Sequence, residues 1–321
     1  MWDFNLLAAT RTIETSMPFV VYRLLICLGA ALGFLLATLA GAGTFVGFGS
    51  LARNALALGP FGAVAGFAVF GFLMYKIRPV WLHVVKAPQL ALIADQAKGT
   101  ALPTGKALIE YAKRRQMECF PSTSALFELD QHIQDTLKDI AAFRPLGLIK
   151  LDHPQARKYL TEAEKRLSAL NHQTLLAWHF YSGSDNPWRT ATQGLALVDR
   201  HFAALTRNRL TITVFSWMGF LAAYPLLLAG IQGLVSGIPV NLSFWPYVFA
   251  GVFAWALKAA FFDAIAEAAM TQCFFPLASQ EAGVAPSAEL EQRSVAFRHI
   301  QQKAGEMLIG EIPTIDKADK P

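Results

Sequence analysis

The sequence has little charge. Only 16% of its 321 residues are Asp, Glu, Lys or Arg, whereas soluble domains average about 25%. The deficit is confined to two apolar blocks, residues 18–75 and 210–275, while the rest of the chain has the composition of a soluble protein. This uneven distribution argues against a single soluble domain and indicates a polytopic membrane protein with a water-facing part.

Cysteine is also scarce. The three cysteines are Cys27, Cys119 and Cys273, and none of them belongs to a CxxC pair or to any other metal-like spacing. A disulfide framework needs an even number of paired cysteines in a short secreted chain, so that class of protein is excluded. We expect three free thiols.

Catalytic and ligand motifs are missing from the sequence as well. There is no GxSxG, no HExxH and no Walker loop, because the GAGTFVG run lacks a preceding strand and a following Lys-Ser/Thr. His172 and His179 are seven residues apart and could form a metal pair on one helix face, or could be two ordinary histidines. We expect no metal, no cofactor and no enzyme activity.

The second apolar block predicts a pair of membrane-spanning helices. Its two runs, 210–235 and 244–275, each exceed the roughly 20 residues that cross a bilayer core. The first block is too long for one crossing and predicts two spans, 18–39 and 59–75, joined by a glycine-rich connector that is either a loop or a re-entrant segment. Glycines four residues apart predict close helix packing in these two spans, at Gly29 and Gly33 and at Gly62 and Gly66.

Basic residues predict the orientation. Lys76, Arg78, Arg207 and Arg209 flank the spans on the side of the middle region, whereas the connectors carry only Arg53. By the positive-inside rule, the middle region and both termini face the cytoplasm, in a bacterial inner membrane. The net charge of +5 therefore indicates either contact with anionic lipid headgroups or simply the positive-inside bias, and not a nucleic-acid partner. The predicted division is an N-terminal cytoplasmic or interfacial segment (1–17), transmembrane hairpin 1 (18–76), a cytoplasmic helical domain with an interfacial helix (77–209), transmembrane hairpin 2 (210–276) and a cytoplasmic tail (277–321).

Helical periodicity dominates the middle region, so the predicted fold class is all-α. An apolar stripe with three- and four-residue spacing runs from Leu126 to Ile140, with Ser122 or Ser124 as the candidate cap. In the segment SGSDNPWR, Ser184 or Asp185 is predicted to cap a helix whose first turn contains Pro187. The apolar face of that helix places it at the membrane interface, or alternatively against soluble neighbours.

Ionisable residues near the inner end of the fourth span form the candidate site. Asp263 and Glu267 share a helical face, while Lys258 lies about 140° from Asp263 around an ideal helix. Charged groups in a span are costly, so we interpret the three as a polar cluster that binds a cation or relays protons. The alternative is that Lys258 snorkels to the surface and both carboxylates are solvated. Pro225 in the third span is the candidate hinge.

Residues 171–275 carry a resemblance. The SDNPW turn, the following amphipathic helix, the apolar hairpin and the segment WALKAAFFDAIAEAAMTQCFF are similar to uncharacterised bacterial four-span membrane proteins. More distantly, the order resembles the C-terminal part of choline transporter-like proteins, with Asn186, Phe261, Phe262 and Thr271 in comparable places. The chain lacks that family's additional spans and large extracellular loop, so no binding residue is transferred.

Two functions are compatible with these features. The first is a transport or channel-type membrane protein, which Pro225, the Lys258, Asp263 and Glu267 cluster and the resemblance favour. Because four spans are few for enclosing a solute pathway, a homo-oligomer is expected. The second is a membrane scaffold or adaptor whose cytoplasmic helices bind a protein partner or shape the bilayer.

Overall fold

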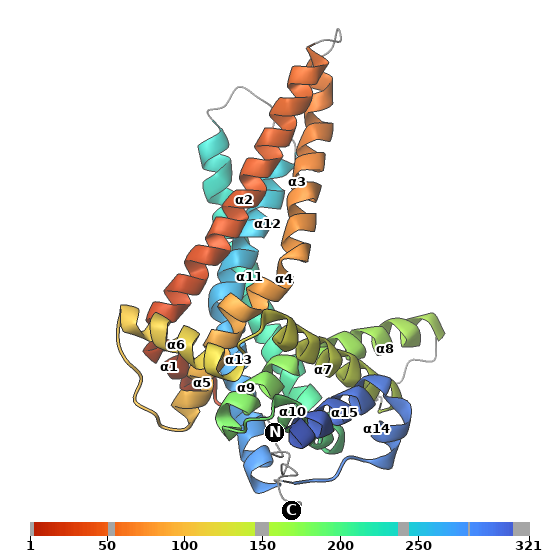
Figure 1. Cartoon of the computed structure of the whole chain (residues 1–321). Coiled ribbons are helices and arrows are strands. Elements are labelled where there is room, and N and C mark those ends of the chain that lie inside the picture. The colour runs from red at the N-terminus through yellow and green to blue at the C-terminus, as the bar shows by residue number, and fades with distance from the viewer. Residues whose placement is uncertain (1–2, 51–54, 145–153, 237–243, 282, 311–321) are drawn as a thin grey trace, which may run out of the picture.

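The computed structural model describes residues 3–50, 55–144, 154–236, 244–281 and 283–310. Every regular element in these ranges is a helix (Figure 1). The all-α prediction is therefore confirmed for the described part of the chain. Residues 145–153 of the middle region and most of the loop between the third and fourth predicted spans lie outside these ranges.

Four helices are long and apolar enough to cross a membrane, as predicted. They are α2 (Met17–Gly49), α3 (Gly59–Lys76), α11 (Phe202–Val235) and the continuous helix Trp245–Gln280. The last consists of α12 (Trp245–Leu257), the π-turn η3 (Lys258–Phe262) and α13 (Asp263–Gln280). These candidate spans rise from a base of shorter helices (Figure 1). Within them α2 packs along α3 and against α12, and α12 packs along α11.

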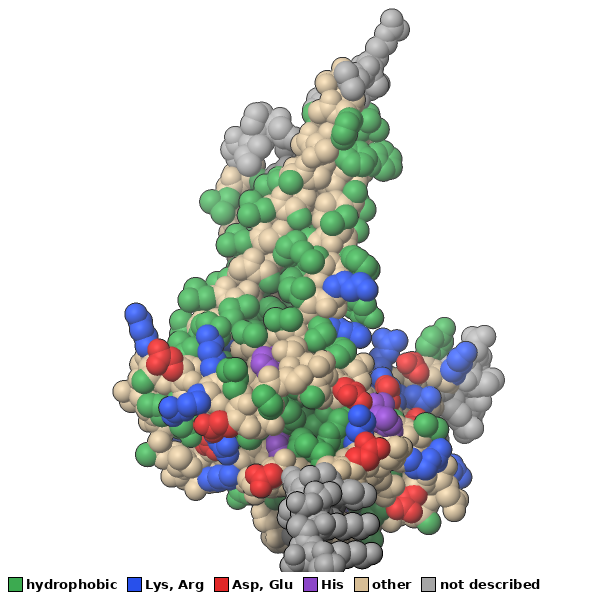
Figure 2. Space-filling view, viewed as in Figure 1, with side chains coloured by type: hydrophobic (Ala, Val, Ile, Leu, Met, Phe, Trp, Pro, Cys, Tyr) green, Lys and Arg blue, Asp and Glu red, His purple; other side chains and the backbone are tan. Residues whose placement is uncertain are grey.

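The outer surfaces of the candidate spans are apolar. Leu36 of α2, Phe72 of α3 and Leu226 of α11 are 64%, 62% and 76% exposed, respectively. Hydrophobic side chains cover the upright part of the molecule, whereas charged side chains gather on the base (Figure 2). Exposed apolar surface of this extent is characteristic of helices that are surrounded by lipid or by partner chains.

The first span is longer than predicted. Its expected end was Leu39, followed by a loop or re-entrant connector, but α2 continues as a helix to Gly49. Gly41 in this part of the helix lies directly against Gly62 of α3 and has no space for a side chain. Close backbone packing thus accounts for Gly41, which lies within the predicted connector. Residues 51–54 lie outside the described ranges.

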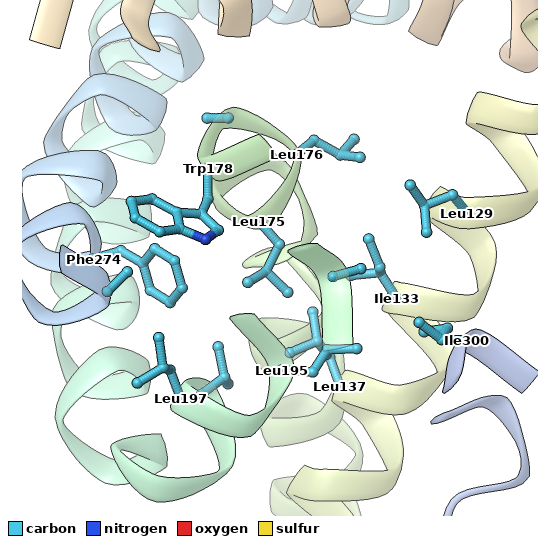
Figure 3. Packing of buried hydrophobic residues seen from close by; sticks show 14 of the residues in the cluster. Leu129, Ile133, Leu137, Leu175, Leu176, Trp178, Leu195, Leu197, Phe274 and Ile300 are labelled. Carbon is cyan, nitrogen blue, oxygen red and sulfur yellow. The ribbon is translucent and has the colours of Figure 1, made fainter. Parts of the chain in front are cut away.

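The base is built around one large hydrophobic core (Figure 3). The predicted stripe of α7 is buried in it from Leu126 to Ile140, and the Ser122 side chain caps that helix by accepting from the Ala125 amide. The helices of the base, together with α13, are α1 (Leu6–Thr15), α4 (Arg78–Trp81), the π-turn η2 (Leu82–Lys86), α5 (Ala87–Ala97), α6 (Lys106–Cys119), α7 (Thr123–Phe143), α8 (Pro154–Ala169), α9 (His172–Ser182), α10 (Pro187–Arg200), α14 (Ala288–Arg293) and α15 (Val295–Gly310).

Helix α10 belongs to this core and not to an interface. Its apolar face, which includes Trp188 and Leu195, is buried against protein, so the structure favours the alternative of packing on soluble neighbours. The predicted cap was also wrong. Asn186 caps α10, with its side-chain oxygen accepting from the Arg189 amide at 3.0 Å and its nitrogen donating to the Ala304 carbonyl at 3.0 Å. Asparagine is as good a cap as serine, and the Asn186 side chain also bonds to α15.

The predicted tail is part of the base. Phe297 and Ile300 of α15 are fully buried in the same core as α7 and α10. The boundary expected at residue 276 also falls inside α13, which continues to Gln280. The described tail residues therefore complete the base and do not form a separate segment.

Candidate functional site

Two π-turns mark the junction between the candidate spans and the base. One is η3, where the Asp263 amide bonds back five residues to the Lys258 carbonyl, and the other is η2, which ends at Lys86. Single π-turns inside α-helices are rare and occur frequently at functional sites. Each of these two contributes a lysine to the same polar region.

The turn η3 brings Lys258 and Asp263 together. On an ideal α-helix the two would lie far apart around the axis, but a π-turn stacks residue i above residue i+5. The Lys258 ammonium donates to Asp263 Oδ1 at 2.6 Å, and the Ser216 hydroxyl of α11 donates to the same oxygen at 2.6 Å. The ammonium also lies over the rings of Trp217 and Trp255, 5.2 and 5.1 Å from their centroids. Lys258 is only 7% exposed, so it does not snorkel.

Glu267 forms a second ion pair, with Arg23 of α2. Arg23 Nη1 lies 3.2 Å from Glu267 Oε2, and the two side chains are 3% and 2% exposed. In the orientation that satisfies both neighbours, the Gln173 amide donates to Glu267 at 3.0 Å and accepts from Lys86 at 2.6 Å. The Glu267 carboxylate is therefore paired inside the protein and is not solvated. It ties the first candidate span to the fourth and to the base.

Arg209 of α11 is the unusual member of this region. It is 6% exposed, and its Nε and Nη1 atoms make no hydrogen bond within the described residues. The negative charges of Glu267 and Asp263 attract the guanidinium. Both carboxylates, however, already accept hydrogen bonds from other basic side chains of this region. An arginine that is buried with unused donors is costly unless a further acceptor is supplied. The Nε and Nη1 donors of Arg209 could therefore bind an anion.

We define these side chains as the inner charge cluster: Arg23, Lys86, Gln173, Arg209, Ser216, Lys258, Asp263 and Glu267. It contains four basic side chains and two carboxylates, so its formal charge is positive. Burial lowers the pKa of Lys86, and the nearby Glu267 opposes this shift. The cluster is thus a desolvated region with an excess of hydrogen-bond donors.

Three of the predicted site residues are in this cluster and one is not. Lys258, Asp263 and Glu267 are all present, although Lys258 and Asp263 form one pair and Glu267 belongs to another. Pro225 lies inside the continuous helix α11 and is exposed on its surface. It is nine residues beyond Ser216, which corresponds to about 13 Å along the axis at about 1.5 Å per residue.

Sequence reasoning missed five site residues, namely Arg23, Lys86, Gln173, Arg209 and Ser216. Arg23 had the clearest signal, because it is one of two charges that interrupt the first apolar block. Arg209 was interpreted only as an orientation signal at the end of a span. Nothing local in the sequence distinguishes Gln173, which reaches the cluster only because α9 packs against α13.

The two histidines considered as a metal pair have separate partners. His172 Nδ1 lies 2.7 Å from the Ala169 carbonyl, and its Nε2 lies 3.6 Å from Asp130. His179 Nδ1 lies 3.4 Å from the Thr190 hydroxyl. Burial lowers the pKa of His179 to about 4, so the ring is neutral at pH 7. These contacts assign both histidines to the packing of the base.

Comparisons with protein-family models, curated proteins and solved structures find no match to this chain. The resemblance to choline transporter-like proteins is therefore still a prediction. Two of the residues that carry the resemblance make structural contacts. Asn186 caps α10, and the Thr271 hydroxyl donates to the Ala268 carbonyl of its own helix. The functional argument consequently depends on the inner charge cluster alone.

Proposed function

We propose that this chain is an integral protein of the cytoplasmic membrane, of transport or channel type, whose inner charge cluster binds a charged solute. The four apolar helices would cross the bilayer as two hairpins, with the base and both termini in the cytoplasm. The observation that carries the proposal is Arg209, a buried arginine with unused donors on α11, the helix that packs against the π-turn η3. Buried ionisable groups at this depth are expensive to maintain and commonly mark solute or ion pathways.

The charge balance favours an anion over the cation that the sequence suggested. Both carboxylates are occupied, Asp263 by Lys258 and Glu267 by Arg23, so neither offers a free ligand to a metal cation. Arg209, in contrast, adds a positive charge whose Nε and Nη1 donors are bonded by no carboxylate among the residues that the structure describes. Guanidinium groups bind carboxylate and phosphate oxygens well because their planar fork can present two parallel N–H donors to two oxygens. A small anion is therefore the solute class that complements the cluster.

The helix arrangement supports an oligomer. The main contacts run from α3 to α2, from α2 to α12 and from α12 to α11, which is an open row and not a closed ring. A solute pathway enclosed by protein would need a surface from another copy to complete it. The exposed apolar faces of α3 and α11, with Phe72 and Leu226 at 62% and 76%, provide area for such contacts or for lipid.

The scaffold alternative loses one of its motivations. The amphipathic stripe of α7 was its candidate docking surface, but Leu129, Ile133 and Leu137 are covered by the chain's own core (Figure 3). The apolar face of α10 is covered in the same way. A protein without flux activity would return this alternative to first place.

Flux measurements on vesicles test the proposal. Purified protein is reconstituted into liposomes, and the entry of chloride and of phosphate is followed with wild type, Arg209→Gln and Arg207→Gln. We expect flux above that of protein-free vesicles, and a reduction of about tenfold or more in Arg209→Gln, since one lost charged hydrogen bond costs about 1.5–3 kcal/mol. Arg207 is two residues away and exposed, so its variant is the matched control and should behave as wild type. Wild-type flux equal to that of empty vesicles for both anions would contradict the proposal.

A further inference from the structure

A second group of polar side chains lies in the base, where α15 packs on α7. Glu128 and His132 are four residues apart on α7, so they share one helical face. His299 of α15 lies opposite them, with its Nε2 3.4 Å from Glu128 Oε1. The rings of His132 and His299 have centroids 4.4 Å apart. One ligand atom from each of the three residues lies within 4.8 Å of the other two.

We propose that Glu128, His132 and His299 form a binding site for one transition-metal dication, such as Zn²⁺, that fastens α15 to α7. Two imidazoles and one carboxylate are ligands that Zn²⁺ prefers, and three protein ligands leave a fourth position for water. Hard cations such as Mg²⁺ and Ca²⁺ prefer sets made only of oxygen. The site is separate from the inner charge cluster and does not depend on the proposed transport function.

The geometry requires only a small contraction around the ion. Zn–N and Zn–O bonds of about 2.0–2.2 Å place tetrahedral ligand atoms about 3.4 Å apart. The Glu128 and His299 side chains are 43% and 37% exposed, so both have room to change rotamer.

Lys303 competes with a metal ion for this site. Its ammonium lies 3.8 Å from Glu128 Oε1 and 6.0 Å from the centre of the Trp188 ring. A bound dication would repel this ammonium and displace it from Glu128. Removal of the Lys303 charge should therefore strengthen metal binding, an effect that a merely structural histidine pair would not produce.

The test uses the full-length protein in detergent, without a polyhistidine tag and stripped of metal. Zn²⁺ is titrated against a chromophoric chelator, and Co²⁺ is added separately to record its absorption spectrum. We expect one Zn²⁺ per chain, a Co²⁺ spectrum of four-coordinate type and a higher Tm with Zn²⁺. His132→Ala and His299→Ala should each weaken binding at least about tenfold, since the loss of even an outer-shell partner costs about 10- to 100-fold. Lys303→Met should bind more tightly than wild type.

His201→Ala is the matched control. His201 also lies beside a carboxylate, with Nε2 3.0 Å from Glu281 Oε1, but Arg200 is paired with that same carboxylate. This variant should bind Zn²⁺ as wild type does. The proposal is overturned if wild type shows no saturable binding of one Zn²⁺ per chain, or if His299→Ala binds as tightly as wild type while its metal-free Tm is unchanged. An affinity of Lys303→Met below that of wild type would also contradict it.

Discussion

Gly66→Leu is expected to separate α2 from α3 and to destabilise the protein strongly. A Cβ on Gly66 would lie 2.1 Å from the carbonyl oxygen of Ala37, and one on Gly62 would lie 2.2 Å from that of Gly41. The obstructing atoms are backbone, so neither helix can yield by a rotamer change. Overpacking typically costs about 1–3 kcal/mol and occasionally more. We expect a loss at the upper end, about 3 kcal/mol, in reversible unfolding with mixed detergents.

The matched control for this prediction is Gly29→Leu. Gly29 lies on the same helix as Ala37 and Gly41, but a Cβ there would meet nothing within 4 Å. This variant should unfold as wild type does. Gly62 and Gly66 thus confirm the predicted close packing, whereas Gly29 does not take part in it. Equal stability of Gly66→Leu and Gly29→Leu would show that α2 and α3 are not in contact at these glycines.

Glu267→Ala is expected to cost about 3–5 kcal/mol, because it leaves the guanidinium of Arg23 buried without its carboxylate. Arg23 and Glu267 are 3% and 2% exposed, so water does not replace the lost partner. The Gln173 amide would lose an acceptor in the same variant. The loss is measured as the change in the free energy of unfolding relative to wild type.

A double variant and a surface pair make this measurement specific. Arg23→Met with Glu267→Leu removes both charges and should recover most of the stability, since apolar replacement of a buried pair is often neutral or stabilising. Glu162 forms a surface pair with Arg166, and the two side chains are 55% and 81% exposed, respectively. Glu162→Ala removes this pair and should change the free energy of unfolding by less than about 0.5 kcal/mol. If Glu267→Ala is as mild as Glu162→Ala, the buried pair is not formed in the folded protein.

Hydropathy and periodicity predicted the helices well. Long apolar runs predicted four spans, and the spacing from Leu126 to Ile140 predicted the buried face of α7. These signals are local, so they can be read from one segment at a time. The apolar face of α10 was equally clear, but periodicity does not distinguish a protein core from a lipid surface, which is why its environment was predicted wrongly.

The site was less predictable because its contacts join distant segments. Arg23 and Glu267 are 244 positions apart, and no local pattern pairs them. Lys258 and Asp263 were separated by the assumption of an ideal helix, whereas the π-turn between them changes the angular register. Glu128 and His132 are four residues apart on one helix, a spacing compatible with a metal site, but they belong to no HExxH motif, and the third ligand His299 is 171 positions from Glu128.

Labelling of single cysteines tests most directly the claim that four helices cross the membrane and leave the base on one side. The native cysteines are replaced by alanine, and a cysteine is placed at Ser50, Ser236 or Met117, all of which are exposed. We predict that an impermeant maleimide added to intact spheroplasts labels Ser50→Cys and Ser236→Cys, and reaches Met117→Cys only after the membrane is opened. Labelling of all three positions on the same side would contradict the account.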